Sequence, residues 1–112
     1  MVDFRKHESA IRELVAQFNQ NDPRWIWDVR SLKQSVVEVY WGRLWQLKDG
    51  RKPFFMLEAM EFADDRTDIL VIDEWGNTIG IWSLPDPYGL SEEKNIQMAL
   101  WQLFSRSRLF YN

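Results

Sequence analysis

The first part of the chain shows apolar residues at the spacing of one helix face. They recur at i, i+3, i+4 and i+7, a pattern typical of a helix with one buried side. The positions are Ile11, Leu14, Val15 and Phe18. We predict a helix over residues 5–20, ended by the sequence Asn-Asp-Pro. Residues 25–30 alternate as a strand does, although the Asp-Pro pair before them would also suit a short capped helix; the strand is preferred.

From residue 35 onward the apolar positions repeat with a period of two, which is typical of a strand with one buried face. The pair Asp49 and Gly50 suits a two-residue type I′ hairpin turn, because both residue types tolerate a positive φ. With this turn, the numbers of opposite residues sum to 99, and Val37 faces Phe62. Two independent alternations then place their apolar residues on one side of the sheet.

This register assigns structural roles to four side chains. Trp41 and Trp45 fall on the buried side and are predicted to be core residues. Arg43 lies between them, and Glu58 is its diagonal neighbour on the opposite strand. Burial would require that Arg43 and Glu58 pair, or that Arg43 stack on an indole ring.

Two observations compete with this register. It places Glu38 directly opposite Glu61, which is unfavourable unless that side of the sheet is wet. Residues 54–63 are also rich in Met, Leu, Glu and Ala, which favour a helix. The choice between strand and helix for this stretch is left open.

The second half of the chain predicts a hairpin followed by a helix. Residues 68–74 contain four consecutive apolar residues, as in a strand buried on both faces. A Gly-Asn turn within residues 75–78 leads to a partner strand, TIGIWSL. Ser91 is a suitable N-cap for a helix over residues 92–106. The apolar stripe of that helix is Ile96, Ala99, Leu100, Leu103 and Phe104.

The order of these elements predicts an α+β fold. We expect one domain over residues 1–112, with an N-terminal helix, an antiparallel meander of four to five strands and a C-terminal helix packed on one sheet face. The terminal sequence SRSRLFYN is interpreted either as a tail beside the sheet or as an intermolecular contact.

Composition narrows the functional class. The start of the chain lacks the apolar stretch of a signal peptide, and no apolar run approaches the roughly 18 residues of a spanning helix, so we expect a cytoplasmic protein with no membrane contact. The chain has no cysteine, which excludes disulfides and thiolate metal sites. A net charge of −3 argues against nucleic-acid binding.

The charges are unevenly distributed. Residues 1–52 carry ten basic and seven acidic side chains, residues 53–93 carry one and ten, and residues 94–112 carry three and none. The acidic middle is interpreted either as solvated turns and strand ends, or as a negative surface for a basic partner or for the positive ends of the chain itself.

No motif in the chain names a reaction. His7, the only histidine, is interpreted as a surface residue at a helix start. The run ILVIDE resembles a nucleotide-hydrolase strand, but the sequence contains no phosphate-binding loop to accompany it. We therefore predict no catalytic residue, no metal site and no cofactor.

The remaining signal is an excess of aromatic residues, with seven Trp, seven Phe and three Tyr. Because one small core can hardly hide all of them, we expect some at an interface. The candidate partner-binding residues are Asp73, Glu74, Trp75, Trp101, Phe110 and Tyr111. The preferred hypothesis is a non-enzymatic protein-binding module of adaptor, chaperone-like or inhibitor type that forms a homodimer. The alternative is a small enzyme or ligand-binding domain with a pocket between sheet and helices, lined by Glu38, Glu58 and Glu61.

Overall fold

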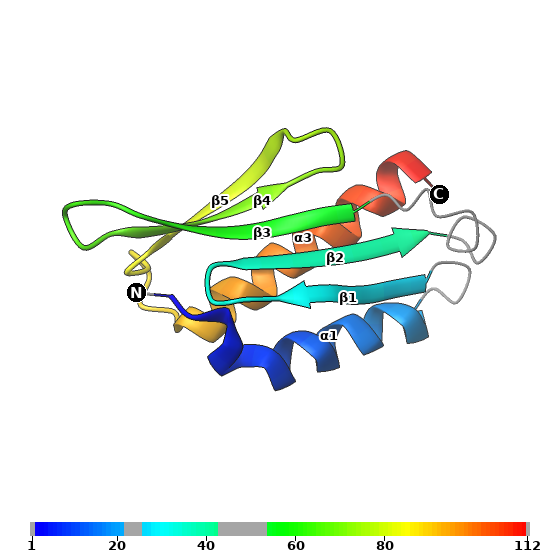
Figure 1. Ribbon diagram of the computed structural model, residues 1–112, viewed down its shortest axis with the longest axis horizontal. Helices are drawn as coiled ribbons and strands as arrows, with labels where there is room; N and C mark the ends of the chain where they lie inside the picture. Colours follow the sequence, from blue (N-terminus) through cyan, green and yellow to red (C-terminus); the bar gives the residue numbers. More distant parts are fainter. Residues whose placement is uncertain (1, 22–25, 43–53, 112) are drawn as a thin grey trace.

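The protein folds as a five-stranded antiparallel sheet with two helices packed on it (Figure 1). The computed structural model describes residues 2–21, 26–42 and 54–111, with side chains described except at residues 54 and 107–111. The elements are η1 (Phe4–His7), α1 (Glu8–Asn21), β1 (Ile26–Leu32), β2 (Val36–Gly42), β3 (Phe54–Glu61), β4 (Thr67–Ile72), β5 (Thr78–Leu84) and α3 (Glu92–Tyr111). The strands follow the order β1-β2-β3-β4-β5. The predicted α+β class is confirmed.

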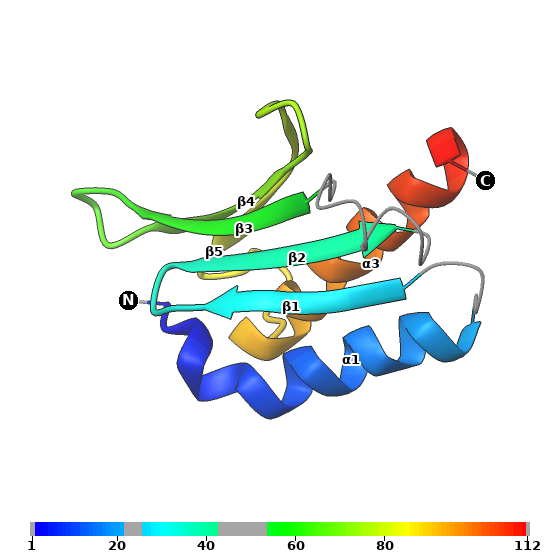
Figure 2. The ribbon, with the colours of Figure 1, turned by 45° about the vertical axis from the view of Figure 1, so that its right-hand side comes forward.

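Both helices lie on the same face of the sheet. α1 runs beside β1, and α3, which contacts β4 and β5, passes behind β2 in the views of Figures 1 and 2. The predicted face of α1 is buried at all four positions, Ile11, Leu14, Val15 and Phe18. At the N-terminus, the Asp3 carboxylate accepts a hydrogen bond from the Arg5 backbone N–H and begins η1.

Residues 26–32 form strand β1, so the strand preferred for this stretch is confirmed from Ile26 onward. A side chain covers the backbone of this outer strand. The Asn19 Oδ1 accepts a hydrogen bond from the Trp27 N–H at 2.6 Å, and the Asn19 Nδ2 donates to the Trp27 carbonyl at 3.0 Å. The amide of Asn19 therefore takes the place of a neighbouring strand at this point.

Residues 54–61 also form a strand, which excludes the helical alternative for them. The predicted register of β2 and β3, however, is wrong. Val37 pairs with Leu57 and Val39 with Phe55, so the numbers of opposite residues sum to 94 rather than 99. The predicted turn at Asp49-Gly50, together with Arg43 and Trp45, lies outside the described residues.

The corrected register reverses the faces of β3. Because a shift by an odd number of residues exchanges the two sides of a strand, Phe55 and Leu57 face the helices. Glu58 lies on the opposite face, between Val36 of β2 and Leu70 of β4. Its predicted position on the aromatic face, diagonal to Arg43, is therefore wrong.

β4 and β5 form the predicted hairpin, with β4 in the interior of the sheet. Ile69 and Val71 are fully buried on the helix side, and β4 ends at Ile72, two residues earlier than predicted. The register shifts near Ile79, whose carbonyl accepts a hydrogen bond from the Gln102 side chain of α3. A Cβ on Gly80 would collide with Gln102, so this glycine allows α3 to approach β5 closely.

α3 begins as predicted, because the Ser91 hydroxyl accepts a hydrogen bond from the Lys94 N–H at 3.1 Å. All five residues of the predicted apolar stripe are buried. The helix continues to Tyr111, beyond its predicted end at residue 106.

Aromatic rings connect both helices to the sheet. The Trp27 ring lies 5.4 Å from Phe18 of α1 and 5.9 Å from Phe104 of α3, measured between ring centroids. It also lies 6.0 Å from Trp41, its partner on β2. Trp27 is 3% exposed and Trp41 is 1% exposed, which confirms Trp41 as a core residue.

Within the described residues, no helix combines the length and the apolar character that would let it cross a bilayer.

Replacing Trp41 by Ala tests the importance of this cluster. The substitution leaves a large cavity between β1, β2 and β3, and we expect it to lower the free energy of unfolding by about 3–5 kcal/mol. Trp75→Ala is the matched control, because that indole is 67% exposed; its loss should stay below about 1 kcal/mol. Chemical denaturation of both variants measures the difference, and equal losses would contradict the assignment.

Candidate protein-binding surfaces

The turn between β4 and β5 presents the most exposed tryptophan of the described chain. Asp73, which is 4% exposed, holds this turn in place. Its Oδ1 accepts hydrogen bonds from the backbone N–H groups of Trp75 at 3.0 Å and Asn77 at 2.8 Å. The positive φ of Gly76, 84°, completes the turn. The backbone beneath the Trp75 side chain is therefore well ordered by its own hydrogen bonds.

The same turn is joined to the C-terminal part of α3. The Asp73 Oδ2 lies 4.0 Å from the Arg106 Nη2, so the turn and the helix carry opposite charges at their contact. Burial raises the pKa of the Glu74 carboxyl, and the charge of Asp73 adds to this effect, whereas a backbone hydrogen bond and Arg106 oppose it. Phe110 and Tyr111 follow on α3, but their side chains lie outside the described residues.

Trp101 lies elsewhere. Its ring meets Phe18 of α1 at 5.0 Å and Phe104 at 5.6 Å, and 39% of the residue is exposed. It therefore lines the junction of α1 and α3, whereas Trp75 lies in the turn of the β4–β5 hairpin, at the other edge of the sheet from β1. The structure brings Asp73, Glu74 and Trp75 together but separates Trp101 from them.

A groove that the sequence did not reveal lies beside β5. Its volume is about 400 Å³, and it is bounded by β5, by the loop of residues 85–90 and by the start of α3. Ile81, Tyr88 and Leu90 line it with exposed side chains. The sequence PDPYG indicates a break in the sheet. It contains Tyr88 and directly follows the uncharged strand sequence TIGIWSL, and this combination was the signal in the sequence for an apolar surface here.

The groove also contains one ordered carboxylate. The Asp86 Oδ1 accepts a hydrogen bond from the Tyr88 N–H at 2.7 Å, and its Oδ2 accepts one from the Asn95 side-chain amide at 2.9 Å. Asn95 is 2% exposed and bonds the Ser91 carbonyl as well. The loop is thus attached to α3 through a buried amide.

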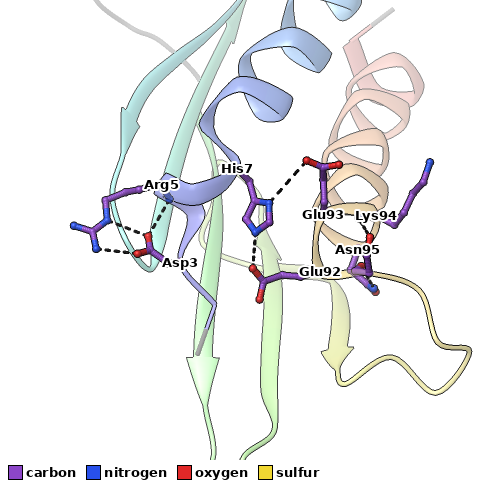
Figure 3. A network of polar contacts seen from close by, with 8 residues as sticks. Asp3, Arg5, His7, Glu92, Glu93, Lys94 and Asn95 are labelled. Carbon is purple, nitrogen blue, oxygen red and sulfur yellow. Dashed lines mark hydrogen bonds and ion pairs between the residues drawn. The ribbon is translucent and has the colours of Figure 1, made fainter.

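His7 forms a polar contact that the sequence interpretation missed. Its Nε2 lies 2.5 Å from the Glu92 Oε2, and its Nδ1 lies 4.0 Å from the Glu93 Oε1 (Figure 3). His7 is therefore not an isolated surface residue, because it joins η1 to the start of α3. Together with the pair of Asp73 and Arg106, this contact shows the acidic middle of the chain binding groups from both ends of the chain.

The carboxylates of the alternative, enzymatic hypothesis do not converge as its register required. Glu38 pairs with Met56 rather than with Glu61, and Glu58 lies on the face away from the helices. Glu61 lines a separate pocket with Val2 and the β1–β2 turn. Among the side chains that the structure describes, no group of three or more His, Asp or Glu residues could hold a metal ion.

Comparisons with protein families, with curated proteins and with solved structures find no match to this chain.

The contact of His7 with Glu92 should be measurable as a coupling energy. A double-mutant cycle with His7→Ala, Glu92→Ala and the double variant isolates the pairwise term. Because the hydrogen bond involves a carboxylate and is partly buried, we expect a coupling of about 1 kcal/mol in thermal or chemical unfolding. Strictly additive losses would show that the two side chains do not stabilise each other.

The raised pKa of Glu74 predicts a pH-dependent stability. A carboxyl whose folded pKa exceeds its unfolded value of about 4.3 favours the fold below that value and loses this contribution as pH rises through the folded pKa. Glu74→Gln should therefore raise the melting temperature at pH 7, and the gain should shrink as pH falls towards 4. Glu13→Gln, at an exposed site on α1, is the control. A gain that is equal at every pH would contradict this origin.

Proposed function

We propose that the chain is a non-enzymatic protein-binding module of adaptor, chaperone-like or inhibitor type, with Trp75 at the centre of its partner surface. The observation that carries the proposal is the 67% exposure of this indole on a turn that Asp73 holds by hydrogen bonds. A large aromatic side chain on an ordered backbone loses little conformational freedom on binding, and such residues are frequent hot spots of interfaces.

The charge beside Trp75 favours a basic partner. Glu74 follows the buried Asp73 in the turn, so the turn beside Trp75 carries two carboxyl groups, and Arg106 lies near that of Asp73. Complementary charge would accelerate association with a basic protein and weaken association with an acidic one. The proposal assigns Phe110 and Tyr111 to the same surface because they follow Arg106 on α3.

Homodimer formation is the second part of the proposal. Trp101 is its candidate contact, since part of the indole remains exposed at the junction of α1 and α3. Contact between the acidic middle of one copy and a positive end of another would add electrostatic complementarity. The elution mass in gel filtration with light scattering tests this part. A monomer mass at tens of micromolar protein and physiological salt would refute it.

The partner surface is tested by capture from native lysate with wild-type and variant protein. Trp75→Ala should retain the fold but weaken binding of the captured partner by roughly 2 kcal/mol or more, as expected of a hot spot. Met60→Ala, at an exposed position of β3, is the matched control and should bind normally. Calorimetry with the identified partner measures the difference.

Two outcomes would contradict the proposal. Equal affinity of wild type and Trp75→Ala would remove Trp75 from the interface. A small molecule or metal ion that stays with the protein through purification, detected by native mass spectrometry, would favour the alternative of a ligand-binding domain or enzyme.

A further inference from the structure

We infer that the groove beside β5 binds a lysine or arginine side chain carried by an extended segment of a protein partner. This surface is separate from the Trp75 turn, so the inference shares with the proposed function only the statement that the partner is a protein with basic groups. Three features of the groove support it: its apolar walls, its single carboxylate and the outer strand that forms its edge.

The walls fit the methylene stem of a long basic side chain. Ile81 is 58% exposed, Tyr88 is 89% exposed, and Leu90 and Met98 complete the lining with further apolar surface. Lysine and arginine bury their aliphatic stems on such surfaces while the charged group stays at a polar site. A volume of about 400 Å³ leaves room for one such side chain and the residues next to it.

The polar site in the groove is Asp86. Its carboxylate is oriented by the Tyr88 N–H and by the buried Asn95 amide, and no described Lys or Arg side chain pairs with it. Both of these partners are neutral, so the negative charge is not balanced within the groove. A guanidinium or ammonium group would supply that balance, and the rings of Trp82 and Tyr88, which line the same groove, would add cation–π attraction.

The part of the chain around the groove is negatively charged, as Asp86 is. Residues 53–93 contain ten acidic side chains and one basic side chain, and they include β5 and the loop that bounds the groove. An anionic or acidic ligand would be repelled here, whereas a basic segment would be attracted. Charge complementarity therefore selects the chemistry of the occupant.

The edge of the groove favours an extended segment. Ile81, Trp82 and Ser83 are consecutive residues of β5, and all three line the groove. β5 is the outer strand of the sheet, and its sequence TIGIWSL contains no charge or proline that would oppose pairing. A partner segment could thus add backbone hydrogen bonds to β5 while one of its side chains enters the groove. At the other edge of the sheet, the Asn19 side chain already forms hydrogen bonds with the backbone N–H and carbonyl of Trp27, so these groups are not available to a partner strand.

The test uses acetylated, amidated heptapeptides of sequence TVTKTVT, titrated into the isotope-labelled protein of residues 1–112 and followed by NMR. The central residue is Lys, Arg, norleucine or Glu in otherwise identical peptides. We expect the Lys and Arg peptides to shift the signals of residues 81–83 and 88–90, with affinities at least about tenfold higher than the norleucine and Glu peptides. Equal affinity of the norleucine peptide, or no shift with any peptide, would overturn the inference.

Variants of the protein examine each feature of the groove. Asp86→Asn removes the charge, Tyr88→Ala removes an exposed ring, and Ile81→Lys places a competing cation in the groove; each should weaken the Lys peptide about tenfold or more. Tyr88→Phe retains the ring and should bind as the wild type does. Because Ile81 and Tyr88 are exposed, their variants remain informative even if Asp86→Asn alters the loop. Unchanged binding by both would refute the groove as the site.

Further arms separate this inference from the alternatives. Methylation of alternate backbone nitrogens of the Lys peptide should abolish binding, and full retention would refute strand pairing with β5. If the peptides fail and Asp86→Asn converts a dimer to a monomer, the occupant is a second copy and the inference is wrong.

Trp75→Ala should leave peptide binding unchanged. Failure of the peptides with Trp75-dependent capture intact refutes this inference alone, and the reverse result refutes only the Trp75 surface.

Discussion

The packing of Trp27 against its aromatic neighbours is the interaction on which the rest of the fold depends. Its ring contacts Phe18 of α1 and Phe104 of α3 as well as Trp41 of β2, so one side chain joins two helices to two strands. Asn19 fixes the backbone of the same residue with two hydrogen bonds. Apolar burial and the backbone hydrogen bonding of an outer strand are therefore satisfied at one position.

Contacts between charged and polar side chains also hold α3 in place. The acidic middle of the chain contacts groups from both ends of the chain: His7 lies against Glu92, and Arg106 lies against Asp73. Both contacts involve α3 and attach it at two places, one near its start and one in its second half. Part of the negative charge of residues 53–93 thus has a partner within the chain.

These two surfaces lie at opposite ends of one strand. The turn that presents Trp75 precedes β5, and the groove with Asp86 and Tyr88 lies against its second half and the loop that follows. Seven residues of extended chain separate them by roughly 20 Å. β5 thus has an exposed aromatic side chain beside its start and a carboxylate-bearing groove beside its end.

The sequence alone determined the elements whose signal is local. The stripe of α1, the buried run of β4 and the Ser91 cap of α3 each depend on residues within a few positions of one another, and the structure has all three. The register of β2 on β3 depends on how two strands pack against the helices, and there an assumed turn at Asp49-Gly50 gave a shift that exchanged the faces of Glu58 and Leu57. The contact of His7 with Glu92 and the groove around Asp86 join segments that are distant along the chain. Only the tertiary structure decided them, because no local periodicity records which distant residues will meet.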